Sequence, residues 1–124
     1  MAGGASRPGV RTIARLARTQ EAIRVVNDQH GSPTLASDPA AALVHAAGRA
    51  TQESAAWGAH HFCNAGETTW YGLAGAVADL DHRVAPSGKA AVYSVLDTST
   101  WRPAFRMVPR PWREALDEVL CELT

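Results

Sequence analysis

Apolar residues recur every three or four positions in three parts of the chain, which is the spacing of one helix face. Residues 10–20 carry apolar positions opposite a row of arginines, and this pattern predicts an amphipathic helix. A second stripe, from Trp70 to Leu80, predicts a helix that opens at residues 66–68. The third stripe covers residues 111–123, where Pro111 suits the first helical turn because the missing N–H costs nothing there.

A fourth helix is predicted over residues 39–47 from the signals at its ends. Ser37 offers an N-cap, Asp38 favours the positive end of the helix, and Gly48 ends it. The predicted packed face consists of Leu43, Val44 and Ala47. A short helical turn near residues 99–101, capped by Asp97 or Thr98 and interrupted by Pro103, is also expected.

Two short runs predict strands, at Ile23–Val26 and at Ala59–Asn64, and residues 91–96 are expected to be extended. Polar, glycine- and proline-bearing stretches predict loops at residues 49–58 and 81–89. Strands that alternate with helices define an α/β fold class.

Length and composition indicate one globular domain. The chain has 124 residues, of which 46% are hydrophobic, and its twelve basic and twelve acidic residues cancel. Residues 1–9 are expected to form a flexible tail and residues 10–124 the folded domain. No net charge points to nucleic acid, and no run of about eighteen apolar residues points to a membrane. The two cysteines lack a paired spacing, which favours a reduced, cytoplasmic setting.

Residues 24–34 combine a β-branched run with a shaped polar loop, and the rest of the chain is organised around them. Asn27 and Asp28 favour leaving a strand, Gly31 can take a positive φ, and Pro33 fixes its own φ. Such a loop could grip a ligand or could simply connect a strand to a helix. Local physics favours the plain connection, since most loops of this kind carry no ligand.

Other candidate chemistry is weaker. His60, His61 and Cys63 invite a metal site, but neighbours on a strand face opposite ways, so at most two of the three could converge. Buried, hydrogen-bonded histidines are favoured instead. The arginines of the first helix, Arg11, Arg15 and Arg18, favour a solvated face over a nucleic-acid contact.

Catalytic motifs are missing from the sequence. No strand is followed by the closely spaced glycines that cradle a phosphate, and neither tyrosine has a lysine four positions later. No glycine-flanked nucleophilic serine and no zinc-binding His-Glu-x-x-His is present. We therefore expect no catalytic residue, no cofactor-binding residue and no metal ligand in this chain.

Four stretches resemble a known family when taken in order. They are Asp-Gln-His-Gly-Ser-Pro-Thr at 28–34, Gly-Glu-Thr-Thr-Trp-Tyr at 66–71, Ser-Val-Leu-Asp-Thr-Ser at 94–99 and Pro-Trp-Arg-Glu-Ala-Leu at 111–116. The chain from about Val10 onward resembles the C-terminal part of the NAD(P)H-dependent dTDP-4-dehydrorhamnose reductases, which belong to the extended short-chain dehydrogenase superfamily. The resemblance implies the C-terminal portion of a Rossmann-like fold that lacks the dinucleotide-binding half.

The resemblance also implies a function. Enzymes of this family reduce the 4-keto group of dTDP-4-dehydro-L-rhamnose with NADPH or NADH, and their N-terminal part holds the cofactor loop and the catalytic residues. By resemblance, this chain would supply the substrate-binding portion and be inactive when isolated. The implied substrate-binding residues are Asp28, Gln29, Gly31, Pro33 and Thr34.

Two kinds of partner follow from the missing half, besides the nucleotide-sugar substrate. The chain could work with a separate N-terminal reductase half, or its unpaired strands could make it self-associate and leave it marginally stable. An alternative reading is a non-catalytic regulatory or scaffold module of the same fold family.

Overall fold

The computed structural model describes residues 9–52, 57–78, 84–87 and 92–123. Nearly all of the predicted flexible tail lies outside these ranges. The described helices are α1 (Val10–Thr19), α2 (Ser37–Ala50), α3 (Trp70–Ala78), α4 (Trp101–Phe105) and α5 (Trp112–Leu123). The described strands are β1 (Ile23–Val26), β2 (Gln29–Gly31), β3 (Thr68–Thr69), β4 (Val84–Ser87) and β5 (Val92–Tyr93). The α/β class is therefore confirmed.

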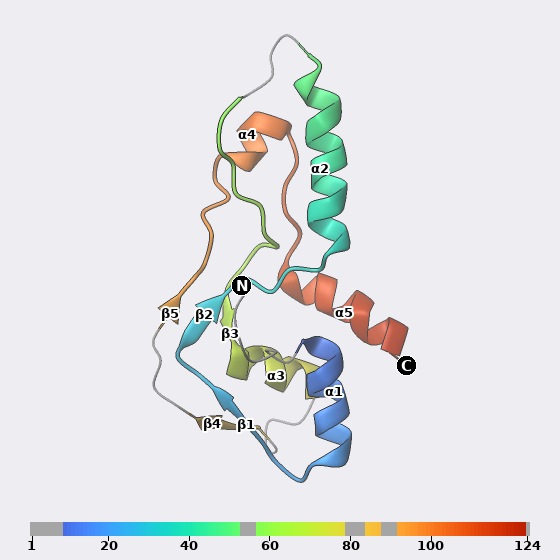
Figure 1. Cartoon of the computed structure of the whole chain (residues 1–124), viewed down its shortest axis with the longest axis vertical. Coiled ribbons are helices and arrows are strands. Elements are labelled where there is room, and N and C mark those ends of the chain that lie inside the picture. Colours follow the sequence, from blue (N-terminus) through green and yellow to red (C-terminus); the bar gives the residue numbers. More distant parts are fainter. Residues whose placement is uncertain (1–8, 53–56, 79–83, 88–91, 124) are drawn as a thin grey trace.

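The strands form two small sheets, and we call them together the bent ribbon because the chain runs from β1 of one sheet into β2 of the other. β1 pairs with β4 in parallel, and β2 pairs with β5 in parallel and with β3 in the antiparallel sense (Figure 1). Asn27 and Asp28 separate β1 from β2, and this is where the chain was predicted to leave its strand. Strand β1 thus ends at two residue types that favour turns over strands.

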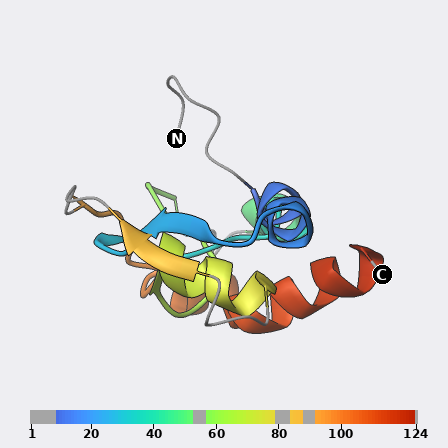
Figure 2. The same cartoon turned by 90° about the horizontal axis from the view of Figure 1, so that it is seen from below.

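Helix α3 joins the two halves of the core. One cluster holds Ile13 of α1 and Val84 of β4 against Ala74, all nearly inaccessible to solvent. The other holds Leu73 against Trp112 and Leu116 of α5. Viewed from below, α3 and α5 lie on one face of the β1–β4 pair and α1 lies at its flank (Figure 2). The apolar stripes predicted for the first and last helices therefore pack against α3.

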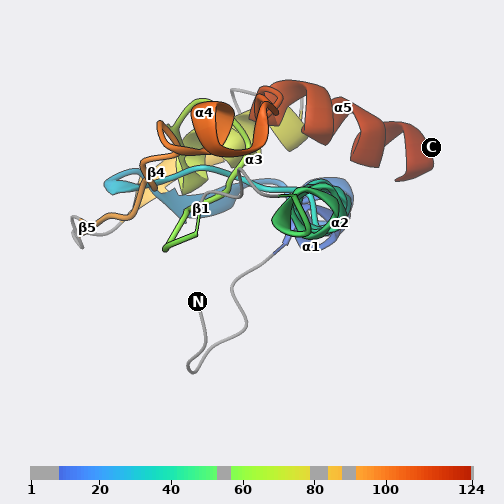
Figure 3. The same ribbon diagram turned by 90° about the horizontal axis from the view of Figure 1, so that it is seen from above.

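The opposite end of the molecule is formed by α2 and α4, which lie side by side (Figures 1 and 3). The ring of His45 lies 2.6 Å from the carbonyl oxygen of Phe105, measured from Nε2. Phe62 and Phe105 both pack on Trp101, with ring centroids 5.1 and 4.4 Å apart. Aromatic contacts therefore tie the segment before α3 to α4.

The prediction of a strand at residues 59–64 was wrong. These residues form no ladder with any described strand, and a single bridge joins Ala65 to Pro111. Alternation predicts that His60 and Phe62 share one face, and both do contact Trp101. It also predicts that His61 and Cys63 share the other face, but His61 is exposed and Cys63 is buried. A strand needs a neighbour for its backbone groups, and among the described residues none lies alongside this one.

Two predicted loops contain strands. Residues 29–31 form β2 instead of a loop, and residues 84–87 form β4 within the stretch 81–89. Val84 is only 5% exposed, so tertiary burial outweighed the local polar composition. Pro86 is tolerated in β4 because β1 is its only described neighbour, which makes β4 an edge strand.

Helix α2 differs from its prediction at both ends and along its face. It begins at Ser37 with Ala36 at the N-cap position, and it continues through Gly48 to Ala50. Its buried residue is Ala42, whereas Leu43 and Val44 are 68% and 76% exposed. The predicted packing of Leu43, Val44 and Ala47 was therefore wrong, because the described neighbours cover only a narrow strip of this helix.

The remaining helix boundaries differ by a few residues. Helix α3 begins at Trp70 because Thr68 and Thr69 are held in β3 by pairing with β2. Pro111 precedes α5 and bridges to Ala65, so it is not the first helical residue. Pro103 lies inside the first turn of α4 and does not interrupt it, since a first-turn residue needs no N–H partner.

Candidate ligand-binding pocket

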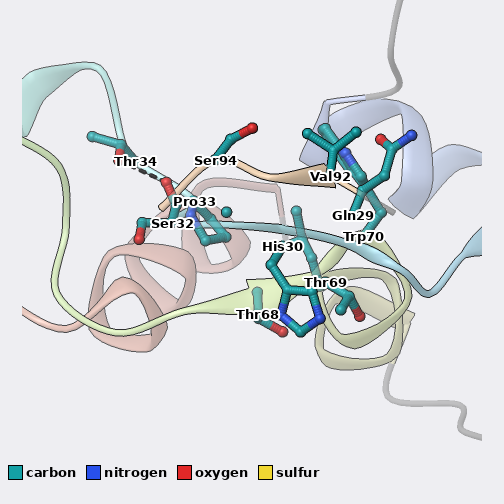
Figure 4. Close-up of a pocket in the computed structure, with 12 residues that line it drawn as sticks. Gln29, His30, Ser32, Pro33, Thr34, Thr68, Thr69, Trp70, Val92 and Ser94 are labelled. Carbon is teal, nitrogen blue, oxygen red and sulfur yellow. Dashed lines mark hydrogen bonds between the residues drawn. The ribbon is translucent and has the colours of Figure 1, made fainter. Parts of the chain in front are cut away.

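A cavity of about 350 Å³ opens between β2, β3, β5 and the start of α3 (Figure 4). Its volume falls at the lower end of the roughly 300–1,000 Å³ that small-molecule sites occupy. The lining residues are Gln29, His30, Gly31, Ser32, Pro33, Thr34, Thr68, Thr69, Trp70, Leu73, Val92 and Ser94. The pocket therefore forms where the bent ribbon meets α3.

Four of the five residues expected to bind substrate line this pocket, namely Gln29, Gly31, Pro33 and Thr34. Asp28 does not line it. Its half-buried position is at the bend between β1 and β2, where its carbonyl oxygen accepts a hydrogen bond of 3.1 Å from the amide of Val92. The structure thus brings most of the expected residues together, and their role in binding stays a prediction.

Sequence reasoning missed the other lining residues. Thr68 and Thr69 reach the pocket because β3 pairs with β2, and Trp70 follows them at the start of α3. The Gly-Glu-Thr-Thr-Trp stretch was a usable signal, but the sequence pattern placed Trp70 in the apolar stripe of a helix. It has both roles, since it also packs against the cluster of Leu73 and Trp112.

The lining surface is mostly apolar, with several hydroxyl groups and little charge. Hydroxyls come from Ser32, Thr34, Thr68, Thr69 and Ser94, and an amide comes from Gln29. Trp70, Leu73, Pro33 and Val92 add apolar surface. None of the described lining residues is Arg, Lys, Asp or Glu. Such a lining suits an uncharged group that carries hydroxyls and an apolar face.

Several of these hydroxyls already bond to the protein. Ser32 donates to the carbonyl oxygen of Gly66 at 2.8 Å, and Thr34 donates to that of Ser32 at 3.0 Å. Thr69 donates to the side-chain oxygen of Asn27 at 2.9 Å and accepts from the amide of Gly72 at 3.1 Å. Among the residues with assigned positions, the hydroxyls of Thr68 and Ser94 have no such partner and could bond to a ligand.

Asn64 anchors the far end of the pocket loop, residues 29–36. Its side chain is inaccessible to solvent. Its Oδ1 accepts from the amide of Leu35 at 2.9 Å, and its backbone amide donates to Thr34 Oγ1 at 3.2 Å. Its Nδ2 donates to Asp38 Oδ2 at 2.5 Å and to the carbonyl oxygen of Arg110 at 3.3 Å. Every polar group of this amide is therefore used.

Asp38 and Arg110 extend this network to α2 and to the segment before α5. Arg110 donates two hydrogen bonds of 2.8 Å to the two oxygens of Asp38 and forms an ion pair of 2.8 Å with Glu118. The Arg110 guanidinium, and less strongly the Asn64 amide, lowers the pKa of Asp38 below its ordinary value of 3.8, although desolvation opposes this. The same bonds from Asp38 and Glu118 raise the pKa of Arg110.

Two glycines near the pocket let neighbouring side chains pack directly against the backbone. Gly66 has a φ of +88°, and a Cβ there would lie 3.1 Å from Cδ1 of Trp112. A Cβ on Gly72 would lie 2.3 Å from Oγ1 of Thr68. Gly66 is needed both for its positive φ and for the space beside Trp112. Gly72 is needed because a side chain there would displace the hydroxyl of Thr68.

The described ranges hold no group of three His, Cys, Asp or Glu side chains that could bind a metal ion. His60 instead lies 3.1 Å from Thr100, measured between Nδ1 and Oγ1, and His61 is exposed. The search of these ranges also found no helix with the length and apolarity that a bilayer span requires. The cytoplasmic location stays a prediction.

The fold and the pocket define an α/β substrate-binding type of domain, and comparison with known proteins identifies its family. The family model for the RmlD substrate binding domain matches residues 3–124, so the chain belongs to that family. The dTDP-4-dehydrorhamnose reductase of Streptomyces griseus is 37% identical over 93% of this chain. The chain spans only 42% of that relative's length.

Solved structures agree with this membership. The dTDP-4-dehydrorhamnose reductase of Clostridium acetobutylicum matches 98% of this chain and 45% of its own, with a TM-score of 0.79 and 26% identity. The Bacillus anthracis reductase, solved in complex with NADP, matches 93% of this chain and 42% of its own, with a TM-score of 0.78 and 25% identity. The expected fold, the C-terminal portion of an extended short-chain dehydrogenase, is confirmed.

The described residues do not fit the NADP that the family implies. A dinucleotide pyrophosphate needs a glycine-rich turn between a strand and a helix N-terminus. Between β2 and α2, the chain has Gly31 followed by Ser32 and Pro33, with no second glycine, and none of the described pocket residues is Arg or Lys. We therefore assign no cofactor contact to this chain.

Proposed function

We propose that this chain forms the substrate-binding portion of an NAD(P)H-dependent dTDP-4-dehydrorhamnose reductase, and that its pocket holds the deoxysugar end of the nucleotide sugar. The observation that carries the proposal is the position of the 28–34 motif, from which Gln29, Gly31, Pro33 and Thr34 line the cavity. Asp28 would support the loop from the bend of the ribbon.

The lining chemistry supports the sugar end over the diphosphate. A diphosphate carries concentrated negative charge and is usually bound by arginine, lysine or helix N-termini. The described lining offers hydroxyls and an amide, which suit sugar hydroxyls, and the indole of Trp70, which suits an apolar sugar face. The diphosphate would then extend away from this pocket.

Reduction of the keto group would need residues from elsewhere. The sequence has no tyrosine followed four residues later by lysine and no dinucleotide-binding glycine loop. The role left for this chain is to bind and orient the sugar. The isolated chain should therefore bind the nucleotide sugar without turnover.

A second surface supports an association with a complementary reductase half. Leu43, Val44 and Trp57 are 68%, 76% and 82% exposed and lie toward the α2–α4 end of the molecule. Exposed large apolar side chains that lie close together usually mark an interface.

Calorimetric titration with dTDP-L-rhamnose, dTDP and thymidine tests the pocket. If the sugar end occupies it, dTDP-L-rhamnose binds more tightly than dTDP, and Thr68→Val weakens only the sugar-bearing ligand. The matched control is Thr19→Val at the exposed end of α1. Equal affinity for dTDP and dTDP-L-rhamnose would place the sugar outside this pocket.

Mixing the chain with the remaining part of the Streptomyces griseus reductase tests the partner. We expect a complex by size-exclusion chromatography and NADPH oxidation in the presence of the keto sugar, with both lost in Leu43→Glu. Failure of the wild-type chain to form this complex, together with a stable monomer, would favour the scaffold alternative.

A further inference from the structure

We infer that Asn64 is the positioning residue that holds the pocket loop, residues 29–36, in its ligand-binding shape. The inference rests on the proposed function, because it assigns Asn64 a role in that same site. Asn64 does not line the pocket, so it would act on a ligand only through the loop.

The first step is the complete use of the Asn64 side chain. An asparagine amide offers one acceptor oxygen and two N–H donors. The oxygen accepts from Leu35 of the loop, and the nitrogen donates to Asp38 and to the carbonyl of Arg110. Because the side chain is inaccessible to solvent, water cannot replace a lost partner without cost.

The second step is the route from Asn64 to the pocket. Its backbone amide donates to Thr34 Oγ1, and the Thr34 hydroxyl donates to the carbonyl of Ser32. Ser32 in turn donates to the carbonyl of Gly66, which closely follows Asn64 in the chain. Thr34 and Ser32 both line the pocket, so the network fixes one wall from two sides (Figure 4).

The third step concerns the residue type. An aspartate at this position would set a second carboxylate against Asp38. A leucine would leave the amide of Leu35 without its acceptor and the carbonyl oxygen of Arg110 without this donor, and Asp38 would keep only its hydrogen bonds from Arg110. Only a side chain with an acceptor and two donors satisfies the three groups that surround it. The fixed chemistry of the site therefore selects asparagine.

Hydrogen exchange of the full chain, followed by mass spectrometry, tests the inference directly. In Asn64→Ala, residues 29–36 should exchange about tenfold faster than in the wild type, the factor that one net hydrogen bond represents. The control Ile13→Val shortens a side chain of the core that is 1% exposed and lies on the other side of α3. It should leave exchange in residues 29–36 unchanged.

Affinity for dTDP-L-rhamnose is the second readout, measured well below the melting temperature so that all variants are folded. Asn64→Ala should weaken binding by about the same factor of ten, and Ile13→Val should not. If Asn64→Ala does not fold, Asp38→Asn replaces it, with a smaller effect expected at residues 29–36.

The outcomes separate the two proposals. Unchanged exchange at residues 29–36 in the Asn64 or Asp38 variant overturns the positioning role, and so does unchanged affinity in a wild type that binds. If the wild type does not bind the nucleotide sugar, the proposed function fails. Faster exchange in the variant would still support the role of Asn64 in shaping the loop.

Discussion

Replacement of Gly66 by alanine should destabilise the protein through two separate effects. Gly66 has a φ of +88°, a conformation that costs an L-residue about 1–3 kcal/mol. The new Cβ would also lie 3.1 Å from Cδ1 of Trp112, whose side chain is 6% exposed and cannot easily move. Crowding of this kind costs about 1–3 kcal/mol.

A smaller effect acts in the opposite direction. Alanine restricts the unfolded chain and so favours folding by about 0.4–1 kcal/mol. The net loss of unfolding free energy should be about 3 kcal/mol. Urea unfolding followed by far-ultraviolet circular dichroism measures this quantity for the wild type and for Gly66→Ala.

Gly48→Ala provides the matched control. Gly48 lies inside α2, and a Cβ there would meet no atom within 4 Å. Alanine is the better helix former by about 0.5–1 kcal/mol, so this variant should be more stable than the wild type. The reasoning would be refuted if Gly66→Ala unfolded within about 0.5 kcal/mol of the wild type, the range of an ordinary surface substitution.

Three further predictions follow from the described contacts. Because the pKa of Asp38 is lowered in the folded state, its ion pair stabilises the protein above about pH 3.8 and the contribution is lost as the pH falls through the folded pKa. The difference in urea midpoint between the wild type and Asp38→Asn should therefore shrink between pH 5 and pH 2.5, as estimated from that linkage; a constant difference would contradict it. Gly72→Ala should displace the Thr68 hydroxyl and weaken dTDP-L-rhamnose binding several-fold, as a lost hydrogen bond does, and adding Thr68→Ala should remove any further effect of Gly72→Ala. Leu43→Glu with Val44→Glu should change the unfolding free energy by less than about 0.5 kcal/mol, since both side chains are exposed, and light scattering should show less self-association than in the wild type.

The sequence predicted the elements whose packing follows from their own periodicity. The stripe of residues 10–20 buries Ile13 and Ala17, and the stripe after Pro111 buries Trp112 and Leu116. The strand at residues 23–26 was also correct. These segments agree with their predictions because the tertiary contacts bury the same face that the pattern marks.

Elements that depend on distant partners were predicted less well. β4 has a polar, proline-bearing sequence and becomes a strand only through pairing with β1. Residues 59–64 have the alternation of a strand but no described neighbour. The apolar face of α2 was assigned to a core that the described chain does not supply for it. Pairing and burial are properties of the assembled fold, and local composition does not contain them.

The pocket was also predicted only in part. The loop motif correctly predicted one wall, which contains Gln29, Gly31, Pro33 and Thr34. The opposite wall comes from Thr68 and Val92, which reach the loop through strand pairing with β2. The supporting role of Asn64 was not visible in the sequence. Its side chain bonds to three segments that are distant in sequence and meet only in the folded chain.

The strand pairing of the bent ribbon also has a kinetic consequence. Its strands pair only with distant segments, as Ile23 does with Val84 and His30 does with Thr69 and Tyr93. No described pair of strands is joined by a tight hairpin that could form early. Chains dominated by such non-local contacts fold slowly, because long loops must close before any strand pair is gained. The pocket requires β2 to pair with both β3 and β5, so it should be among the last parts of the molecule to form.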